Sequence, residues 1–307
     1  MNTNSEITRI GQDGLEAIVQ LAIDAVPSEH SKRAYRHSIE EFLSWWEASG
    51  RPPLIKATVQ RYRSHLQTFD YAPATINLKM AGIRKLAQEA ADNGLIDDIH
   101  ANGISRVKGV KHNGVRTGNW LSKDQAQELL NSPDITTLKG LRDRAVLAVM
   151  LGAGLRRSEV SNLSFEHIQQ RAGRWVIVDI LGKGNRVRTI PIAPWVKYAI
   201  DAWVNAAGIT DGRIFRGLWR YGYTLNPNSE QISTQVVYNI VKEYAGEGVA
   251  AHDLRRTYAK LSNQGGAALG QIQLNLGHAS LRTTEMYLGL ELDLTDAPGD
   301  RLGLRLK

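Results

Sequence analysis

Hydrophobic positions in the first hundred residues recur at the spacing of an α-helix. One apolar stripe runs from Tyr35 to Trp46, with apolar side chains 4, 7, 8 and 11 residues after the first. The same kind of stripe marks residues 15–25, 59–66 and 73–94, and prolines or glycines follow each of them. Four amphipathic helices with short connections predict a small helical bundle of about 100 residues.

The pattern changes after residue 119. Ser122 followed by Gln125 predicts a capping box at the start of a helix. Residues 175–181 are rich in β-branched and aromatic side chains, and a glycine-containing turn separates them from a second strand over 186–192. The remaining predicted helices cover 141–151, 155–163, 233–244, 253–264, 269–276 and 283–288. We therefore expect a mainly α protein with a small antiparallel β-sheet, in which a helical bundle precedes an α+β domain.

A basic, glycine-containing stretch separates the two halves. Residues 105–118 hold four basic residues, three glycines and no acidic residue, which is typical of a linker. The predicted domains are therefore 13–104 and 119–289, with a leucine-bearing tail over 290–307. The linker is either a plain hinge or a hinge that lies along DNA.

The charge of the chain favours a polyanionic partner. Lysine and arginine number 38 against 31 aspartates and glutamates, which gives a net charge of +7. Basic side chains also recur on the predicted helices of the first domain, where they are either solvated surface or contacts to phosphates. The predicted DNA-contact residues are Lys32, Arg33, Arg36, Lys79, Arg84, Lys108 and Lys111.

Composition also excludes several classes of protein. The chain has no cysteine, which rules out disulfide scaffolds, cysteine-ligated zinc and thiol nucleophiles. It has no apolar run long enough for a membrane span and no signal-peptide layout, so we expect a soluble, cytoplasmic protein. Neither a P-loop nor an HExxH pair is present, and we expect no cofactor and no metal.

Four separated islands carry groups suited to phosphate chemistry. They are GLRRSEV at 154–160, GKGN at 182–185, HDLRR at 252–256 and LGHASLRTTEMYLG at 276–289. Each island alone also fits a structural role, as an ion pair, a turn, a helix cap or a core tyrosine. Their combination and order are far more specific than any one of them.

In that order the islands resemble the tyrosine recombinase (phage integrase) family, with a two-domain layout like that of Xer recombinases. The resemblance covers roughly residues 120–290, and the preceding helices are similar to the SAM-like core-binding domain of the family. The family's catalytic pattern falls on Arg156, Lys183, His252, Arg255, His278 and Tyr287. Glu159 is expected to support Arg156.

The resemblance implies a metal- and ATP-independent reaction on DNA. Two arginines would clamp the non-bridging oxygens of a phosphodiester, on which negative charge builds during displacement. Tyr287 would attack phosphorus, with His252 as general acid or base and His278 hydrogen-bonded to the phosphate. Lys183 would protonate the leaving 5′ oxygen, so the product is a 3′-phosphotyrosyl link.

The resemblance further implies assembly on DNA. Four protomers would join two specific double-stranded sites, with accessory proteins as further partners. The tail over 290–307 would dock on a neighbouring protomer or fold back on its own. Three alternatives remain open from the sequence: a type IB topoisomerase-like enzyme, a catalytically silent DNA-binding relative, and a metal-dependent nuclease.

Overall fold

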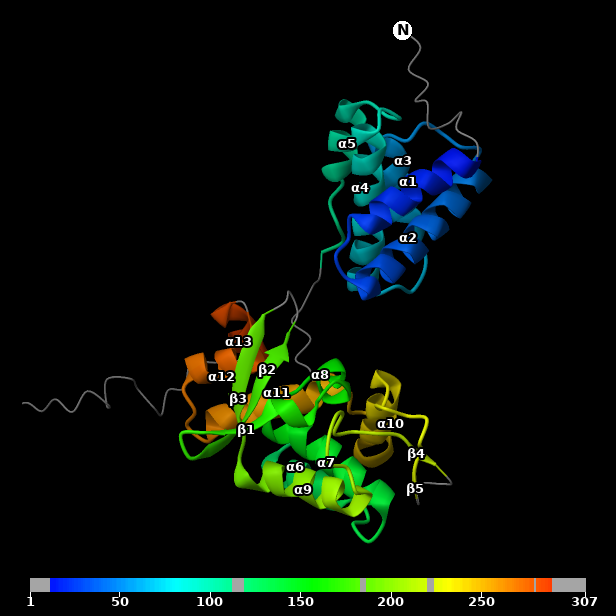
Figure 1. Cartoon of the computed structure of the whole chain (residues 1–307). Coiled ribbons are helices and arrows are strands. Elements are labelled where there is room, and N and C mark those ends of the chain that lie inside the picture. Colours follow the sequence, from blue (N-terminus) through cyan, green and yellow to red (C-terminus); the bar gives the residue numbers. More distant parts are fainter. Residues whose placement is uncertain (1–11, 112–118, 183–185, 220–223, 279, 289–307) are drawn as a thin grey trace, which may run out of the picture. The chain divides into compact units, whose positions relative to one another are not determined.

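The computed structural model describes residues 12–111, 119–182, 186–219, 224–278 and 280–288. The chain divides into two compact units, Met1–Val115 and Arg116–Lys307 (Figure 1). Within the described ranges, no helix is both long enough and apolar enough to cross a membrane.

The first unit is a helical bundle, as predicted. Its helices are α1 (Gln12–Asp24), α2 (Glu29–Ala48), α3 (Lys56–Leu66), α4 (Pro73–Asp92) and α5 (Asp98–Ser105). The predicted stripe of α2 is confirmed, because Ile39, Phe42 and Trp46 are fully buried against α4 and α1. Helix α5 was not predicted.

The first unit extends further along the chain than the sequence indicates. Val107 is buried in the core of the bundle, and the side chain of Asn77 forms hydrogen bonds of 2.8 and 3.0 Å with the backbone N–H and C=O of Val110. Arg63 donates to the carbonyl of Lys108 at 3.0 Å. The chain therefore stays packed on the helices to residue 110, beyond the predicted start of the linker at residue 105. Residues 112–118 lie outside the described part of the chain.

The second unit surrounds helix α7 with helices and one small sheet. The helices are α6 (Lys123–Asn131), α7 (Leu138–Gly152), α8 (Arg157–Ser161), α9 (Pro194–Ala207), α10 (Thr234–Ala245), α11 (Ala251–Gln264), α12 (Leu269–Leu276) and α13 (Leu281–Leu288). The antiparallel sheet has the order β1 (Ile168–Arg171), β2 (Arg174–Leu181), β3 (Val187–Pro191). A separate short hairpin joins β4 (Leu218–Trp219) to β5 (Thr224–Leu225).

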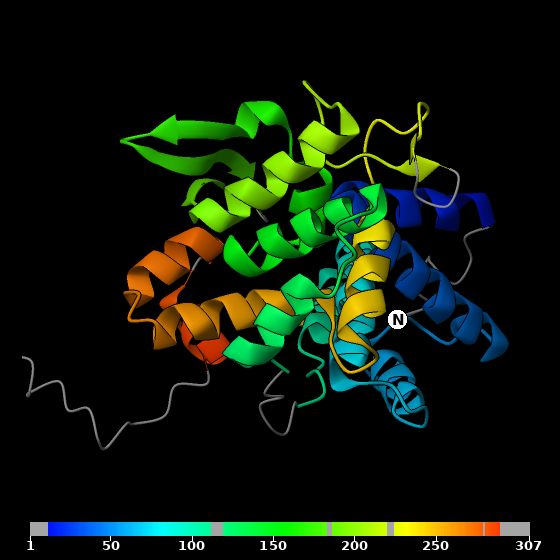
Figure 2. The same ribbon diagram turned by 90° about the horizontal axis from the view of Figure 1, so that it is seen from below.

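Packing around α7 brings distant parts of the chain together. Ten of the fifteen residues of α7 are buried, and α6, α8, α9, α10 and α11 all contact it. The predicted capping box of α6 is confirmed: Ser122 Oγ accepts from Gln125 N–H at 3.2 Å, and Ser122 N–H donates to Gln125 Oε1 at 2.9 Å. Helices α12 and α13 pack beside α11, as the orange and red ribbons show (Figure 2). All four sequence islands therefore belong to the second unit.

Candidate active site

Arg156 is held by the turn that connects α7 to α8. Gly154 has a φ of 63°, and a Cβ atom there would lie 2.7 Å from Cδ1 of Tyr258, so only glycine fits. Arg156 is the N-cap residue of α8. Its backbone N–H donates to Glu159 Oε2 at 2.8 Å, and its Nη1 donates to Glu159 Oε1 at 2.7 Å. Glu159 thus contacts both the backbone and the guanidinium group of Arg156.

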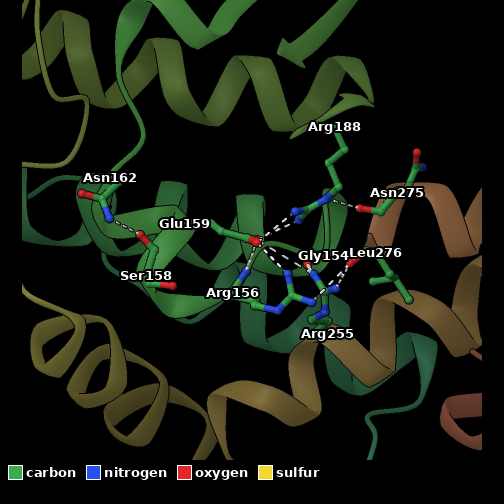
Figure 3. Close-up of polar contacts among 9 residues, drawn as sticks. All are labelled: Gly154, Arg156, Ser158, Glu159, Asn162, Arg188, Arg255, Asn275 and Leu276. Atoms are coloured by element: carbon green, nitrogen blue, oxygen red, sulfur yellow. Dashed lines mark hydrogen bonds and ion pairs between the residues drawn. The ribbon is translucent and has the colours of Figure 1, made fainter. Parts of the chain in front are cut away.

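Arg255 lies one helical turn after His252 in α11 and is buried. Its Nη1 donates to the carbonyl of Gly154, and its Nη2 donates to the carbonyl of Leu276. The Leu276 carbonyl is also 3.5 Å from Arg156 Nη2 (Figure 3). The last carbonyls of a helix have no intrahelical partner and carry partial negative charge, so the end of α12 draws both guanidinium groups to one place.

His278 follows directly on the end of α12. Gly277 closes that helix in the left-handed conformation, and His278 Nδ1 lies 2.9 Å from Thr284 Oγ1, a buried hydroxyl of α13. Burial lowers the pKa of the imidazole, and the positive charges of Arg255 and Arg156 lower it further, to about 4. His278 is therefore neutral at physiological pH.

His252 is the second residue of α11 and lines a cavity of about 460 Å³. Partial burial lowers its pKa, and the charges of Arg256 and Arg255 act in the same direction. The cavity is also lined by Arg156, Arg255 and Arg157, so it combines positive charge with a neutral imidazole. Such a site can bind an anion and transfer a proton beside it.

The other two predicted catalytic residues are described less fully. Tyr287 lies within α13, which packs on α11 and α12; Leu288 beside it is buried, and its carbonyl accepts from Lys260 Nζ at 3.0 Å. The side chain of Tyr287 and the whole of Lys183 lie outside the described atoms. Gly182 N–H donates to the carbonyl of Arg186 at 2.8 Å, which closes the hairpin on both sides of Lys183.

Four of the six predicted residues therefore meet in one place. The charges of Arg156 and Arg255 lower the pKa of both His252 and His278, and His252 also lowers the pKa of His278. These four residues are positioned by the start of α8, by α11 and by the turn after α12.

One buried residue of the site was not predicted. Arg188 of β3 forms two hydrogen bonds to the carboxylate of Glu159, at 3.0 and 2.8 Å. The sequence does carry a signal for it. Along β3 the buried positions alternate, so Arg188 shares the inward face of the strand with Ile190. A charged residue in an inward position indicates a buried partner.

The predicted DNA-contact residues differ in their surroundings. Lys79 is buried and paired with Glu41. Arg84 Nη2 donates to the carbonyl of Val107 at 2.5 Å, which fixes it within the bundle. Lys32 pairs with Glu29, and Arg36 contacts Gln20 and Glu16. Arg33, Lys108 and Lys111 are exposed.

Comparison with known proteins gives one consistent result. Residues 119–291 match the model of the phage integrase family, and residues 19–94 match the phage integrase N-terminal SAM-like domain. The tyrosine recombinase XerC of Pseudomonas putida is 28% identical over 286 residues, which cover 91% of this chain and 92% of the relative. XerC of Thermodesulfovibrio yellowstonii is 28% identical over 271 residues, covering 86% and 87%.

Solved structures share the fold. The XerH site-specific recombinase bound to palindromic difH substrate, in a post-cleavage complex, aligns with a TM-score of 0.66 at 18% identity, covering 94% of this chain and 84% of the other. A lambda integrase dimer bound to a COC′ core site aligns with a TM-score of 0.65 at 15% identity, covering 92% and 78%.

Proposed function

Because the chain belongs to the phage integrase family, and is thus a site-specific tyrosine recombinase that cuts and rejoins DNA, we propose that six residues carry out its chemistry. These residues are Arg156, Lys183, His252, Arg255, His278 and Tyr287. The observation that supports this most strongly is the convergence of two arginines on the carbonyl of Leu276, beside a cavity that His252 also lines.

The two arginines bind the scissile phosphate. Arg156 and Arg255 are already oriented by Glu159, Gly154 and Leu276, so little side-chain freedom is lost when the anion binds. Displacement at phosphorus increases the charge on the non-bridging oxygens, and guanidinium groups fixed in advance stabilise that increase without reorganising. This is the main contribution of the described residues to the rate.

The histidines act in their neutral forms. His278 Nδ1 and Thr284 Oγ1 lie within hydrogen-bond distance. With the hydroxyl as donor, the ring proton lies on Nε2, where it can be donated to a phosphate oxygen. The lowered pKa of His252 keeps its ring able to accept the proton of the attacking phenol.

The covalent step exchanges one phosphoester for another. The phenolic oxygen of Tyr287 forms a bond to phosphorus while the bond from phosphorus to the 5′ oxygen breaks. The phenolic proton passes to His252, and Lys183 gives a proton to the leaving oxygen. The products are a 3′-phosphotyrosyl link and a free 5′-hydroxyl, and attack by another 5′-hydroxyl reverses the step. No nucleotide hydrolysis is needed because the number of phosphoester bonds does not change.

Recombination joins two double-stranded DNA sites, and we propose that four protomers assemble on them. The XerH and lambda integrase structures are themselves complexes with site DNA. An apolar cavity of about 370 Å³ between α6, α7 and α9, with Trp195 and Tyr198 at its edge, offers a docking place for the leucines of a neighbour's 290–307 tail. A DNA substrate also favours a cytoplasmic location, and accessory proteins are further candidate partners.

The test is covalent attachment to DNA without metal. Protein is mixed with a pool of nicked duplexes in chelator and analysed on a denaturing gel. We expect an adduct with the wild type and none with Tyr287→Phe, while DNA affinity stays nearly the same. Tyr71→Phe, at an exposed tyrosine of the first unit, is the matched control and should form the adduct.

Other outcomes would change the proposal. An adduct that survives Tyr287→Phe would move the nucleophile elsewhere. Cleavage that needs added metal would indicate a nuclease. Relaxation of plasmids that lack the trapped sequence would indicate a topoisomerase.

A further inference from the structure

Arg188 makes an unusually complete set of contacts for a charged side chain in a protein interior. Its side chain is 7% exposed. Nη1 and Nη2 form parallel hydrogen bonds to the two carboxylate oxygens of Glu159, at 3.0 and 2.8 Å. Nε donates to the carbonyl of Asn275 at 2.7 Å (Figure 3). This fork geometry is specific to arginine, since the single ammonium of lysine cannot reproduce it.

These contacts tie together the islands that carry the chemistry. Glu159 holds Arg156, as described above. A Cβ atom at Gly277, the residue before His278, would lie 3.0 Å from Cδ of Arg188. A Cβ atom at Gly182, the residue before Lys183, would lie 3.1 Å from its Nη1. Arg188 therefore packs directly against the backbone that precedes two of the proposed catalytic residues.

The same contacts set the charge of the site. Burial of Glu159 disfavours its ionised form, but the hydrogen bonds and charges of Arg188 and Arg156 together outweigh this and hold the pKa of Glu159 below its usual range. The carboxylate is thus ionised, 2.7 Å from Arg156 Nη1 and 3.9 Å from Arg255 Nη1. Without a third cation it would offset one of the two positive charges meant for the phosphate.

Arg188 does not line the cavity that Arg156, His252 and Arg255 share. We propose that Arg188 is a positioning residue for DNA strand cleavage, which neutralises Glu159 and fixes the Arg156, Lys183 and His278 islands relative to one another without contacting the phosphate. This inference rests on the proposed function. In this role, Arg188 keeps the positive charges of Arg156 and Arg255 available to the substrate.

The first test compares the rate of covalent adduct formation in wild type and Arg188→Met. At saturating DNA we expect the variant to be about 10- to 100-fold slower, because small displacements of catalytic groups have effects of that size. DNA affinity, measured by fluorescence anisotropy, should stay within about threefold, since the arginine is remote from the ligand. Arg174→Met, the same change at an exposed position of β2, is the control and should match the wild type.

A second substitution separates charge from packing. Adding Glu159→Gln to Arg188→Met removes the uncompensated carboxylate, while the amide oxygen can still accept from Arg156. We expect the double variant to be at least about fivefold faster than Arg188→Met. A double variant as slow as Arg188→Met, or slower, would overturn the charge-neutralising role, because a loss of packing alone cannot be rescued in this way.

Arg188→Lys tests the geometric role and remains informative if Arg188→Met does not fold. It keeps the charge but not the fork, so we expect adduct formation about three- to tenfold slower than in the wild type. A folded Arg188→Lys protein with wild-type rates would overturn the geometric role. A wild type that forms no adduct at all would refute the proposed function, whereas an active wild type matched by Arg188→Met would refute only this inference.

Discussion

The neutral state of His278 has a consequence for stability that can be measured. In the unfolded chain its imidazole binds a proton near pH 6.5, whereas in the folded protein the pKa is about 4. Between these values the unfolded state holds more protons than the folded state. Stability is therefore complete above pH 6.5 and is lost as the pH falls toward 4.

The size of the effect follows from the shift. Each unit of pKa difference corresponds to about 1.4 kcal/mol, so acidification from pH 6.5 to 4.5 costs at most about 2.7 kcal/mol of unfolding free energy. His278 is only partly buried. Screening by solvent reduces the expected value to roughly half, about 1.4 kcal/mol.

The assay compares wild type with His278→Gln by urea unfolding of the full chain at pH 7.0 and 4.5. Glutamine cannot titrate, so the variant should lose about 1.4 kcal/mol less than the wild type on acidification. His252 and His167 also have lowered pKa values and are present in both proteins, so the effect of His167 cancels in the comparison and that of His252 cancels apart from its coupling to His278. His37→Gln on α2 gives the baseline for removing a histidine outside the site.

A constant difference between the two proteins, within about 0.5 kcal/mol across this range, would refute the reasoning. It would mean that His278 binds its proton as readily in the folded protein as in the unfolded chain. Its role as a neutral hydrogen-bond donor to the phosphate would then have to be abandoned.

Two further predictions concern the neighbouring islands. Lys183→Ala should slow adduct formation on ordinary DNA. The rate should recover when sulfur replaces the leaving 5′ oxygen, because a thiolate leaves without a proton. A rate that stays low on the sulfur substrate would contradict the general-acid role. Gly277→Ala should lower the unfolding free energy by about 1–2 kcal/mol, because alanine is disfavoured at a φ of 62°. It should also slow cleavage because the new Cβ would press on Arg188; a fully active Gly277→Ala protein would show that this contact is unimportant.

The sequence predicted the helices in which hydrophobic residues recur with a strong helical period, and it missed helices without such a pattern. Helices α2 and α4 bury long regular stripes, and both were found. Helix α9 begins at Pro194 and was not predicted, although proline suits the first turn of a helix. Helix α5 has only eight residues, including a glycine and an asparagine, so its local sequence gives little helical signal.

The proposed site residues have a signature in the sequence, but the groups that orient them do not. The order of the four islands and the residue types in them predict which side chains would meet at a phosphate. Backbone carbonyls at Gly154 and Leu276 orient Arg255, and the carbonyl of Asn275 holds Arg188. A carbonyl has no signature in the sequence, since every residue has one. Its availability depends on where a helix ends and what packs there.

The charge of this cluster explains why the loss of Arg188 should reduce rate more than affinity. Among the described residues that meet at Glu159, three guanidinium groups face one carboxylate, which leaves two positive charges. A phosphodiester carries one negative charge, and attack by a phenolate brings it to about two at the transition state. The cluster is therefore better matched to the transition state than to bound DNA. Without Arg188 only one positive charge remains, which suits the ground state and gives no additional stabilisation as the charge builds.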